Sequence, residues 1–300
     1  MDYNIFRGFF ANDKLLFSVP MSEYTSFKIG GPADLMIMPT DSWEIKKAIE
    51  LSNENGLSYH VMGKGSNLLV KDHGFRGVII CTSKNLESFE FLDEHTIKAG
   101  AGITLAKLAA FAGEASLTGL EFASGIPGSL GGAVYMNAGA YGGEMKDIVL
   151  SAGLIDKNGN EVTIDKSEMA LEYRSSIFQK ANYIITDCTL RLTKGNKDEI
   201  KEKMLDLNGR RKEKQPLDLP SGGSTFKRPE GHFASKLIEE AQLKGYSIGG
   251  AKVSEKHAGF IVNYNSATAS DVISLIEYVK AKVYDKFAVS LIPEIEIIGE

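Results

Sequence analysis

One segment of the chain, residues 124–143, reads Ser124-Gly-Ile-Pro-Gly128-Ser-Leu-Gly-Gly132-Ala-Val-Tyr-Met-Asn137-Ala-Gly-Ala-Tyr141-Gly-Gly143. Each glycine in a helix or strand costs roughly 0.5–1 kcal/mol relative to alanine, so this density favours backbone with positive φ or in close contact with another group. Pro127 fixes its own φ and steers Ile126 away from helix. The segment can offer its N–H donors and the amide of Asn137. We interpret it as a backbone wall against a flat or anionic ligand; a glycine-rich loop without a ligand is the alternative.

A second glycine-rich loop, Gly63-Lys64-Gly65-Ser66-Asn67-Leu68, directly follows the predicted strand 59–62. It begins like a dinucleotide fingerprint, but Leu68 stands in place of the third glycine and the residues after it do not have a helical pattern. A Rossmann site is therefore not expected. What remains is a turn with adjacent N–H donors that suits a pyrophosphate. Lys64 lies either over the phosphates or in solvent.

Composition excludes several classes of protein. A chain of 300 residues with 43% hydrophobic content can bury a large core and predicts two or three domains. Its net charge of −5 argues against a nucleic-acid partner. No apolar window reaches the ~18 residues of a membrane helix, and the first residues lack a signal-peptide pattern, so we expect a cytoplasmic protein with no membrane partner. Cys81 and Cys188 are predicted to be buried free thiols, for which a disulfide or a metal-binding pair is the alternative, and the histidine spacing predicts no metal site.

The remaining pattern predicts a mixed α/β and α+β chain. The first unit is strand 35–38, a helix from Asp41-Ser42 to Gly56, and strand 59–62. Strands are expected at 77–82, 89–91, 96–99, 182–192, 251–253, 259–264 and 292–298, an Asn-Gly hairpin at 150–155 and 161–164, and helices at 105–115, 197–215, 233–242 and 269–286.

Three further places carry candidate functional side chains. Arg174 follows Tyr173 and precedes an Ile-Phe pair, so its guanidinium should be partly buried and need a partner, for which a structural ion pair is the alternative. The basic cluster 210–214 is either a solvated helix end or a site that attracts phosphates. Ser224 lies close to two cations, Lys227 and Arg228, and Glu294 alternates with Glu296 on the last predicted strand, where a solvent-facing carboxylate pair is the alternative.

Taken together, these motifs resemble the UDP-N-acetylenolpyruvoylglucosamine reductase family over nearly the whole chain. The resemblance rests on Thr25-Ser-Phe-Lys-Ile-Gly-Gly31, Gly63-Lys-Gly-Ser-Asn67, Gly125-Ile-Pro-Gly128 with Asn137-Ala-Gly139, Tyr173-Arg174, Gly223-Ser224-Thr-Phe226-Lys227 and Glu294. It implies a two-subdomain FAD-binding module of the vanillyl-alcohol-oxidase (PCMH) type plus a C-terminal α/β substrate domain. The expected domains are 1–75 and 76–209, which bind FAD, and 210–300, which binds substrate. No His or Cys lies in the two glycine-rich segments, so the FAD should be non-covalent.

The resemblance also implies roles for residues. NADPH reduces the flavin, which passes hydride to the enolpyruvyl ether of a UDP-sugar in peptidoglycan precursor synthesis. Arg174 and Glu294 would stabilise the resulting enolate, and Ser224 would donate the completing proton. The implied cofactor-binding residues are Gly63, Lys64, Gly65, Ser66, Asn67, Leu68, Gly125, Ile126, Pro127, Gly128, Gly131, Gly132, Asn137 and Gly139. The implied substrate-binding residues are Tyr141, Tyr173, Lys214, Lys227 and Arg228.

The chain departs from the family pattern in two respects. It resembles the shorter type, which lacks an extra substrate-domain loop, and Tyr141 would then cover the site. Arg228 stands where some members have Asn, and Glu296 where many have a basic residue. We expect a monomer that binds only small molecules. Two other functions remain open at this point: an oxidase on the same flavin module, and a non-catalytic flavin-binding or nucleotide-binding protein.

Overall fold

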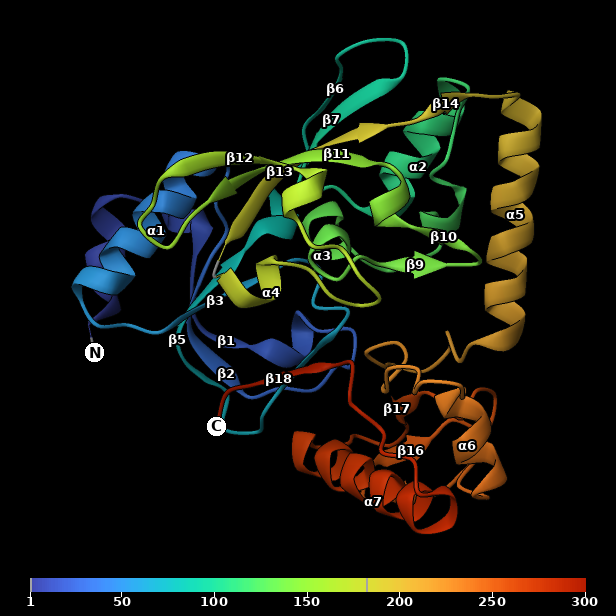
Figure 1. The fold of residues 1–300 in the computed structure, drawn as a ribbon. Coiled ribbons are helices and arrows are strands. Elements are labelled where there is room, and N and C mark those ends of the chain that lie inside the picture. The colour runs from blue at the N-terminus through green and yellow to red at the C-terminus, as the bar shows by residue number, and fades with distance from the viewer. Residues whose placement is uncertain (1, 182) are drawn as a thin grey trace. The chain divides into compact units, whose positions relative to one another are not determined.

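The computed structural model describes residues 2–181 and 183–300, and the chain divides into two compact units (Figure 1). The first unit consists of Met1–Phe17, Leu35–Lys64 and Gly77–Arg211, and the second of Ser18–Asp34, Gly65–Arg76 and Lys212–Glu300. Each unit is thus assembled from three separate stretches of sequence. The division into domains 1–75, 76–209 and 210–300 stays a prediction.

The α-helices are α1 (Ser42–Glu54), α2 (Leu105–Glu114), α3 (Leu130–Tyr135), α4 (Phe178–Ala181), α5 (Lys197–Lys214), α6 (Ala234–Glu240) and α7 (Ala269–Phe287). The five long helical patterns in the sequence are thereby confirmed as α1, α2, α5, α6 and α7. Several of the helices and strands were not expected, and the two longest of them are α3 and β1. The helix α3 lies inside the glycine-rich segment, and a strand, β1, forms near the N-terminus.

The strands are β1 (Leu15–Pro20), β2 (Pro32–Ile37), β3 (Tyr59–Met62), β4 (Leu68–Val70), β5 (Phe75–Cys81), β6 (Phe89–Phe91), β7 (Thr96–Gly100), β8 (Leu117–Thr118), β9 (Gly139–Ala140), β10 (Gly143–Glu144), β11 (Val149–Ile155), β12 (Glu161–Asp165), β13 (Ile184–Arg191), β14 (Thr193–Lys194), β15 (Ser247–Ile248), β16 (Ala251–Val253), β17 (Ile261–Asn263) and β18 (Glu296–Ile298). The predicted strand 182–192 corresponds to β13, and Asn182 itself lies outside the described residues. The last predicted strand, 292–298, is confirmed only at its end, as β18.

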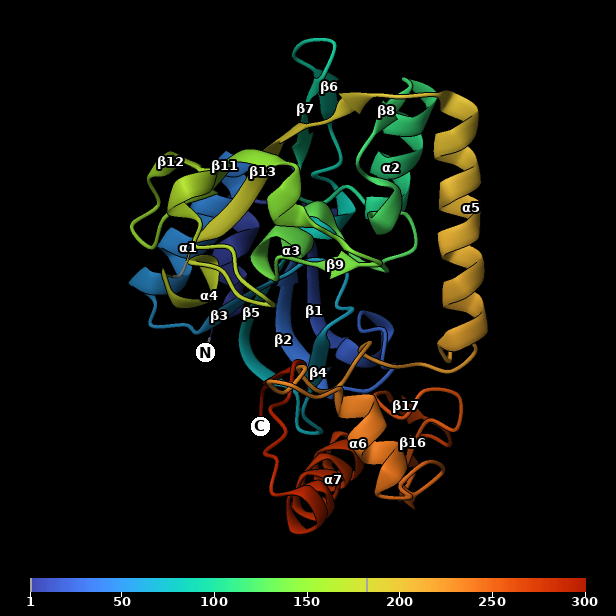
Figure 2. The same cartoon turned by 45° about the vertical axis from the view of Figure 1, so that its right-hand side comes forward.

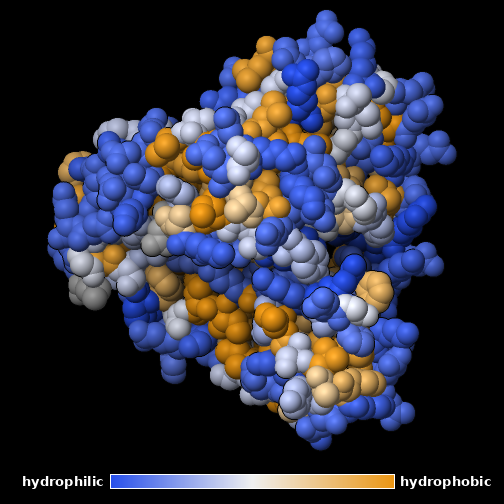
Figure 3. Space-filling model, in the orientation of Figure 1, coloured by the Kyte–Doolittle hydropathy of each residue, from blue (hydrophilic) through white to orange (hydrophobic). Residues whose placement is uncertain are grey.

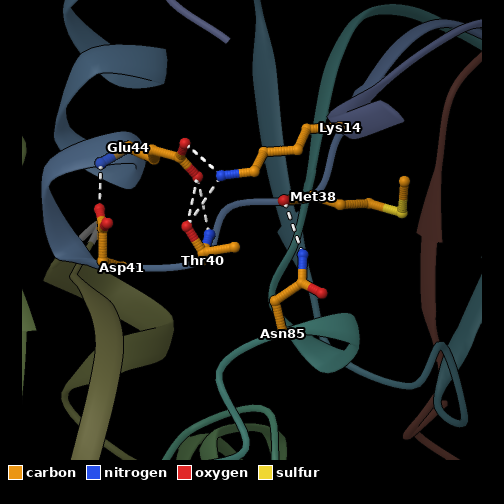
Figure 4. Close-up of polar contacts among 6 residues, drawn as sticks. All are labelled: Lys14, Met38, Thr40, Asp41, Glu44 and Asn85. Carbon is orange, nitrogen blue, oxygen red and sulfur yellow. Dashed lines mark hydrogen bonds and ion pairs between the residues drawn. The ribbon is translucent and has the colours of Figure 1, made fainter. Parts of the chain in front are cut away.

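Polar side chains fix the start of α1, as Figure 4 shows. Asp41 caps the helix, because its carboxylate accepts a hydrogen bond from the Glu44 N–H at 2.9 Å. Glu44 in turn accepts from Lys14 at 2.6 Å and from the Thr40 N–H at 2.8 Å. Asn85 donates to the Met38 carbonyl at 2.9 Å, just before the turn into the helix. This local chemistry explains why the helix could be predicted from its first two residues.

A five-stranded antiparallel sheet, in the order β12-β11-β13-β7-β6, forms the core of the first unit. Its central register pairs Cys188 with Ala152 on one side and with Ala99 on the other, and the Cys188 thiol is fully buried. Cys81 and Cys188 are both free, as predicted. The helix α5 lies beside α2 (Figure 2), and a Cβ at Gly113 would lie 3.0 Å from the Met204 side chain.

The second unit has a separate hydrophobic core, built from α6, α7, the sheet β15-β16-β17 and the parallel pair β4–β18. Asp72 binds the first turn of α7 through the Ala269 N–H at 2.7 Å and the Ser270 N–H at 3.0 Å. An anion at a helix N-terminus satisfies donors that have no partner within the helix. The short segment after β4 is therefore anchored to the longest helix of the unit.

The surface is mixed in character. On the face shown in Figure 3, hydrophilic residues predominate, and hydrophobic residues form patches between them. Among the described helices, none is both long and apolar enough to cross a membrane.

Candidate active site

The loop between β3 and β4 has the backbone conformation that its glycines suggested. Gly65 has a φ of +62°, in the left-handed region that side chains with a Cβ rarely adopt. The residues after it form strand β4 and no helix, which confirms that the segment is not a Rossmann fingerprint. Gly63 and Lys64 belong to the first unit, and Gly65 to Leu68 belong to the second.

The side chain of Ser129 lies directly against Gly63. A Cβ at position 63 would lie 2.2 Å from the Ser129 hydroxyl oxygen, so any larger residue there would have to displace this hydroxyl. That hydroxyl is buried, and among residues 2–181 and 183–300 it has no hydrogen-bond partner. A buried hydroxyl without a partner costs free energy unless a ligand supplies one. The Ser129 side chain was missed by sequence analysis, although it lies inside the quoted segment.

The glycine-rich segment is more regular than its composition suggested. Leu130–Tyr135 forms the helix α3, and the Gly131 N–H donates to the Ala101 carbonyl at 2.9 Å. A Cβ at Gly131 would lie 2.7 Å from the Cβ of Ala101. The glycine at this position therefore allows a helix to pack closely on a neighbouring backbone, and it does not need a positive φ.

Asn137 directs its amide toward the protein. It is buried, its Nδ2 donates to Glu144 and to the Glu172 carbonyl, each at 2.9 Å, and its Oδ1 accepts from the Lys146 N–H at 2.8 Å. These bonds connect the end of the glycine-rich segment to the turn that carries Arg174. The Asn137 side chain therefore shapes the site from inside the unit.

Arg174 is partly buried, as predicted. Its φ is +53°, and its Nη2 donates to the Gly139 carbonyl at 3.1 Å. The guanidinium carbon lies 5.6 Å from the centre of the Tyr173 ring. A non-glycine residue in this conformation is strained by about 1–3 kcal/mol, and such strain concentrates at functional sites. The first unit thus brings Arg174 to the end of the glycine-rich segment.

Arg211 is the last residue of the first unit. The sequence left two interpretations for its basic cluster, a solvated helix end or a site that attracts phosphates. The solvated reading is wrong for Arg211, whose side chain is only 8% exposed. Its guanidinium carbon lies 5.8 Å from the centre of the Tyr141 ring. A Cβ at Gly125 would lie 3.1 Å from the Arg211 Nε and 2.1 Å from the Asn208 Oδ1. Gly125 therefore leaves room for these two side chains of α5.

The second unit brings the segments of Ser224 and Glu294 together. The Glu294 N–H donates to the Thr225 carbonyl at 2.8 Å, and the Lys227 N–H donates to the Ile292 carbonyl at 2.8 Å. Thr225 is fully buried, and its hydroxyl accepts from the Ile261 N–H at 3.0 Å. The backbone on both sides of these two side chains is therefore fixed by hydrogen bonds.

Asn67 connects the predicted flavin loop to the Glu294 segment. Its Nδ2 donates to the Glu294 carbonyl at 3.1 Å, and its own carbonyl accepts from the Glu296 N–H at 2.9 Å. The parallel pairing of β4 with β18 continues this contact, with Leu68 opposite Glu296. The Glu294 backbone is consequently held from both sides, by Asn67 and by Thr225.

The three basic residues expected to bind substrate, Lys214, Lys227 and Arg228, lie in the second unit. Lys214 and Arg228 are exposed, and Lys227 is half-buried. The Arg228 guanidinium carbon lies 4.5 Å from the centre of the exposed Phe233 ring. Within the described ranges, no group of His, Cys, Asp and Glu is arranged to hold a metal ion.

Two protein-family models match the chain. Residues 215–298 match the C-terminal domain of UDP-N-acetylenolpyruvoylglucosamine reductase, and residues 33–165 match an FAD binding domain. A UDP-N-acetylenolpyruvoylglucosamine reductase of Clostridium botulinum (strain Hall) is 51% identical over 295 residues, which are 98% of this chain and 96% of the relative. That of Alkaliphilus oremlandii is 52% identical over 288 residues, or 96% of this chain and 94% of the relative.

Solved structures agree with these matches. The crystal structure of UDP-N-acetylenolpyruvylglucosamine reductase from Thermus caldophilus superimposes with a TM-score of 0.78 and 32% identity, and it covers 95% of this chain and 98% of that one. An alkyldihydroxyacetonephosphate synthase superimposes with a TM-score of 0.50 and 16% identity over 65% of this chain and 41% of that one. This second likeness concerns the fold alone.

Proposed function

The chain belongs to the UDP-N-acetylenolpyruvoylglucosamine reductase family, and we propose that Arg174, Ser224 and Glu294 are the residues that handle charge and proton in its reaction. The reaction is the NADPH-dependent reduction of UDP-N-acetylglucosamine enolpyruvate to UDP-N-acetylmuramate through FAD, a step of peptidoglycan precursor synthesis. The expected flavin module of the vanillyl-alcohol-oxidase (PCMH) type with a C-terminal domain is confirmed.

The residues around Gly63 fit a flavin nucleotide. The buried Ser129 hydroxyl lacks a partner among the described residues, and Gly63 places no Cβ against it. We assign cofactor binding to the loop 63–68 and to the glycine-rich segment, with backbone N–H groups and Ser129 as donors. When bound, FAD accepts a hydride from NADPH and delivers a hydride to the enolpyruvyl group. With no His or Cys in either segment, the protein would hold the flavin non-covalently.

Arg174 would stabilise the negative charge that hydride addition leaves between a carbon and the substrate carboxylate. Its side chain is fixed in advance by the Gly139 carbonyl and by a backbone that the Asn137 network holds. Donors that are already in place stabilise developing charge without the cost of reorganisation. Glu294 would share a proton with the same anion, and its backbone is fixed by Asn67 and Thr225.

Ser224 would supply the proton that completes the reduction. Its hydroxyl is half-buried and, among the described residues, takes part in no hydrogen bond, so it can donate to a ligand. A neutral hydroxyl is a sufficient acid when the base is a carbanion. Lys214, Lys227, Arg228, Tyr141 and Tyr173 would bind the nucleotide. We further propose that the enzyme acts as a monomer in the cytoplasm, where UDP-sugars and NADPH are available.

The partly buried Arg174 in its strained conformation carries this assignment, and a reaction in two stages tests it. The flavin-loaded enzyme is reduced with NADPH without oxygen, and its absorbance is followed after addition of the enolpyruvyl nucleotide. We expect rapid reoxidation by the nucleotide and slow reoxidation by oxygen. The Arg174→Ala variant should keep bound flavin and lose the reoxidation by nucleotide. Rapid reoxidation by oxygen alone would identify an oxidase instead.

A further inference from the structure

Arg211 is a buried cation without an acidic partner. Only 8% of its side chain is exposed, and within residues 2–181 and 183–300 neither a carboxylate at ion-pair distance nor a hydrogen-bond acceptor is found for its guanidinium. Its neighbour Arg210, on the exposed side of the same helix, pairs with Asp206 at 2.8 Å. Among the described residues, the exposed arginine of α5 thus has an acidic partner and the buried one has none.

The surroundings of Arg211 destabilise the charged form of its guanidinium. Burial lowers the pKa of Arg211, the nearby Tyr141 partly opposes this, and the charge of Arg174 lowers the pKa further. Removing a guanidinium from water costs free energy unless an anion compensates it. Among the described residues, Arg211 therefore carries a buried charge near the end of the glycine-rich segment that no carboxylate compensates.

We propose that Arg211 is a second anion-binding residue, which takes the enolpyruvyl carboxylate of the substrate together with Arg174. This proposal rests on the function proposed above. A planar guanidinium matches a carboxylate with two parallel hydrogen bonds, and a pair of them holds a growing negative charge. The flexible, exposed lysines of the same basic cluster, Lys212 and Lys214, suit a diphosphate in solvent better than the buried Arg211 does.

Gly125 and Tyr141 fix where this cation lies. A side chain at position 125 would collide with Asn208 and crowd the Arg211 Nε, so glycine keeps α5 close to the segment. The Tyr141 ring, 5.8 Å from the guanidinium carbon, faces the same cation and is itself exposed. The Tyr141 side chain that lies against this cation therefore extends to the surface of the first unit.

Binding measurements on the flavin-loaded enzyme test the proposal. The two probes are the enolpyruvyl nucleotide and UDP-N-acetylglucosamine, which has the same nucleotide sugar without the carboxylate. In Arg211→Met, the affinity for the enolpyruvyl nucleotide should fall about 10- to 100-fold, as expected for loss of one partner of a buried charge pair. The affinity for UDP-N-acetylglucosamine and the flavin content should stay unchanged. The matched control is Arg210→Met, which should change neither affinity.

A thermal measurement separates this role from a structural one. Without nucleotide, flavin-loaded Arg211→Met should melt at the same temperature as the parent enzyme or higher, because it removes an uncompensated charge. Arg211→Gln should show the same loss of affinity for the enolpyruvyl nucleotide. It provides a second test if Arg211→Met folds poorly. Equal loss of affinity for both nucleotides, loss of flavin, or a lower melting temperature would overturn the proposal. If the parent enzyme binds the enolpyruvyl nucleotide and UDP-N-acetylglucosamine with equal affinity, that result contradicts the proposed function itself.

Discussion

Replacing Ser224 with alanine should separate the two halves of the reaction. The first half, in which NADPH reduces the flavin, protonates no carbon and so gives Ser224 no task. The second half leaves an anion on the substrate that needs an acid. We therefore expect Ser224→Ala to bleach the flavin with NADPH at close to the normal rate and then to react slowly with the enolpyruvyl nucleotide.

The structure indicates that the whole effect will fall on this second step. The Ser224 hydroxyl takes part in no hydrogen bond among the described residues, so its removal breaks none. The next residue, Thr225, is fully buried and fixed through Ile261, Gly259 and Glu294. The backbone should therefore keep its place. Loss of a general acid then slows the step by about 10²–10⁴-fold, or roughly 3–5 kcal/mol of barrier.

Stopped-flow absorbance measures both halves in the same preparation. The Ser224→Cys variant provides the matched control, since a thiol of similar size is a better acid and should recover part of the lost rate. Flavin content and melting temperature should equal those of the parent enzyme in both variants. Equal slowing of the two halves in Ser224→Ala would refute the reasoning, because it would mean that the serine places the flavin or the backbone.

Three further changes test other parts of the structure. Gly65→Val should abolish FAD binding in a folded protein, because a β-branched residue is strained at a φ of +62°; unchanged flavin affinity by titration would contradict this. Thr225→Val should lower the stability of the second unit by about 1–3 kcal/mol, since it leaves the Ile261 N–H buried without an acceptor, and Thr225→Ser should retain most of it in thermal unfolding. Asn67→Ala should slow the reaction of reduced flavin with the nucleotide more than the reduction by NADPH, and an equal effect on both would argue against a link to Glu294.

The elements that could be predicted from the sequence are those whose deciding interactions are local. Asp41 caps α1 through the N–H of Glu44, three residues further along the chain. Tyr59–Met62 is a short run bounded by Gly56 and Gly63, and it forms the strand β3 as predicted. The strand β1 was not expected, and its buried residues do not alternate regularly with exposed ones. The helix α3 was not expected either, because the close contact of Gly131 with Ala101, which requires glycine at that position, joins residues far apart in sequence.

The residues of the candidate site also divide into those that could be predicted from nearby sequence and those that depend on distant parts of the chain. Arg174 could be selected from its apolar neighbours and from the family resemblance, and its partly buried state follows from them. The burial of Arg211 depends on Gly125 and Tyr141, which lie in another part of the chain, so a basic run gave no means of separating it from its exposed neighbours. The unsatisfied hydroxyl of Ser129 is likewise a property of packing, which only the folded chain reveals.

The discontinuous second unit has a consequence for synthesis on the ribosome. The first unit is complete when Arg211 has been made, whereas the second needs contacts such as Asn67 with Glu294, which are 227 residues apart. At about 5–20 residues per second, roughly 4–18 s pass between residues 211 and 300. During that time Phe27, Ile29 and Leu69 lack the residues that bury them in the finished core. The nascent chain thus exposes apolar segments during that time, and the hydrogen bond between the Glu294 N–H and the Thr225 carbonyl is among the last to form in folding.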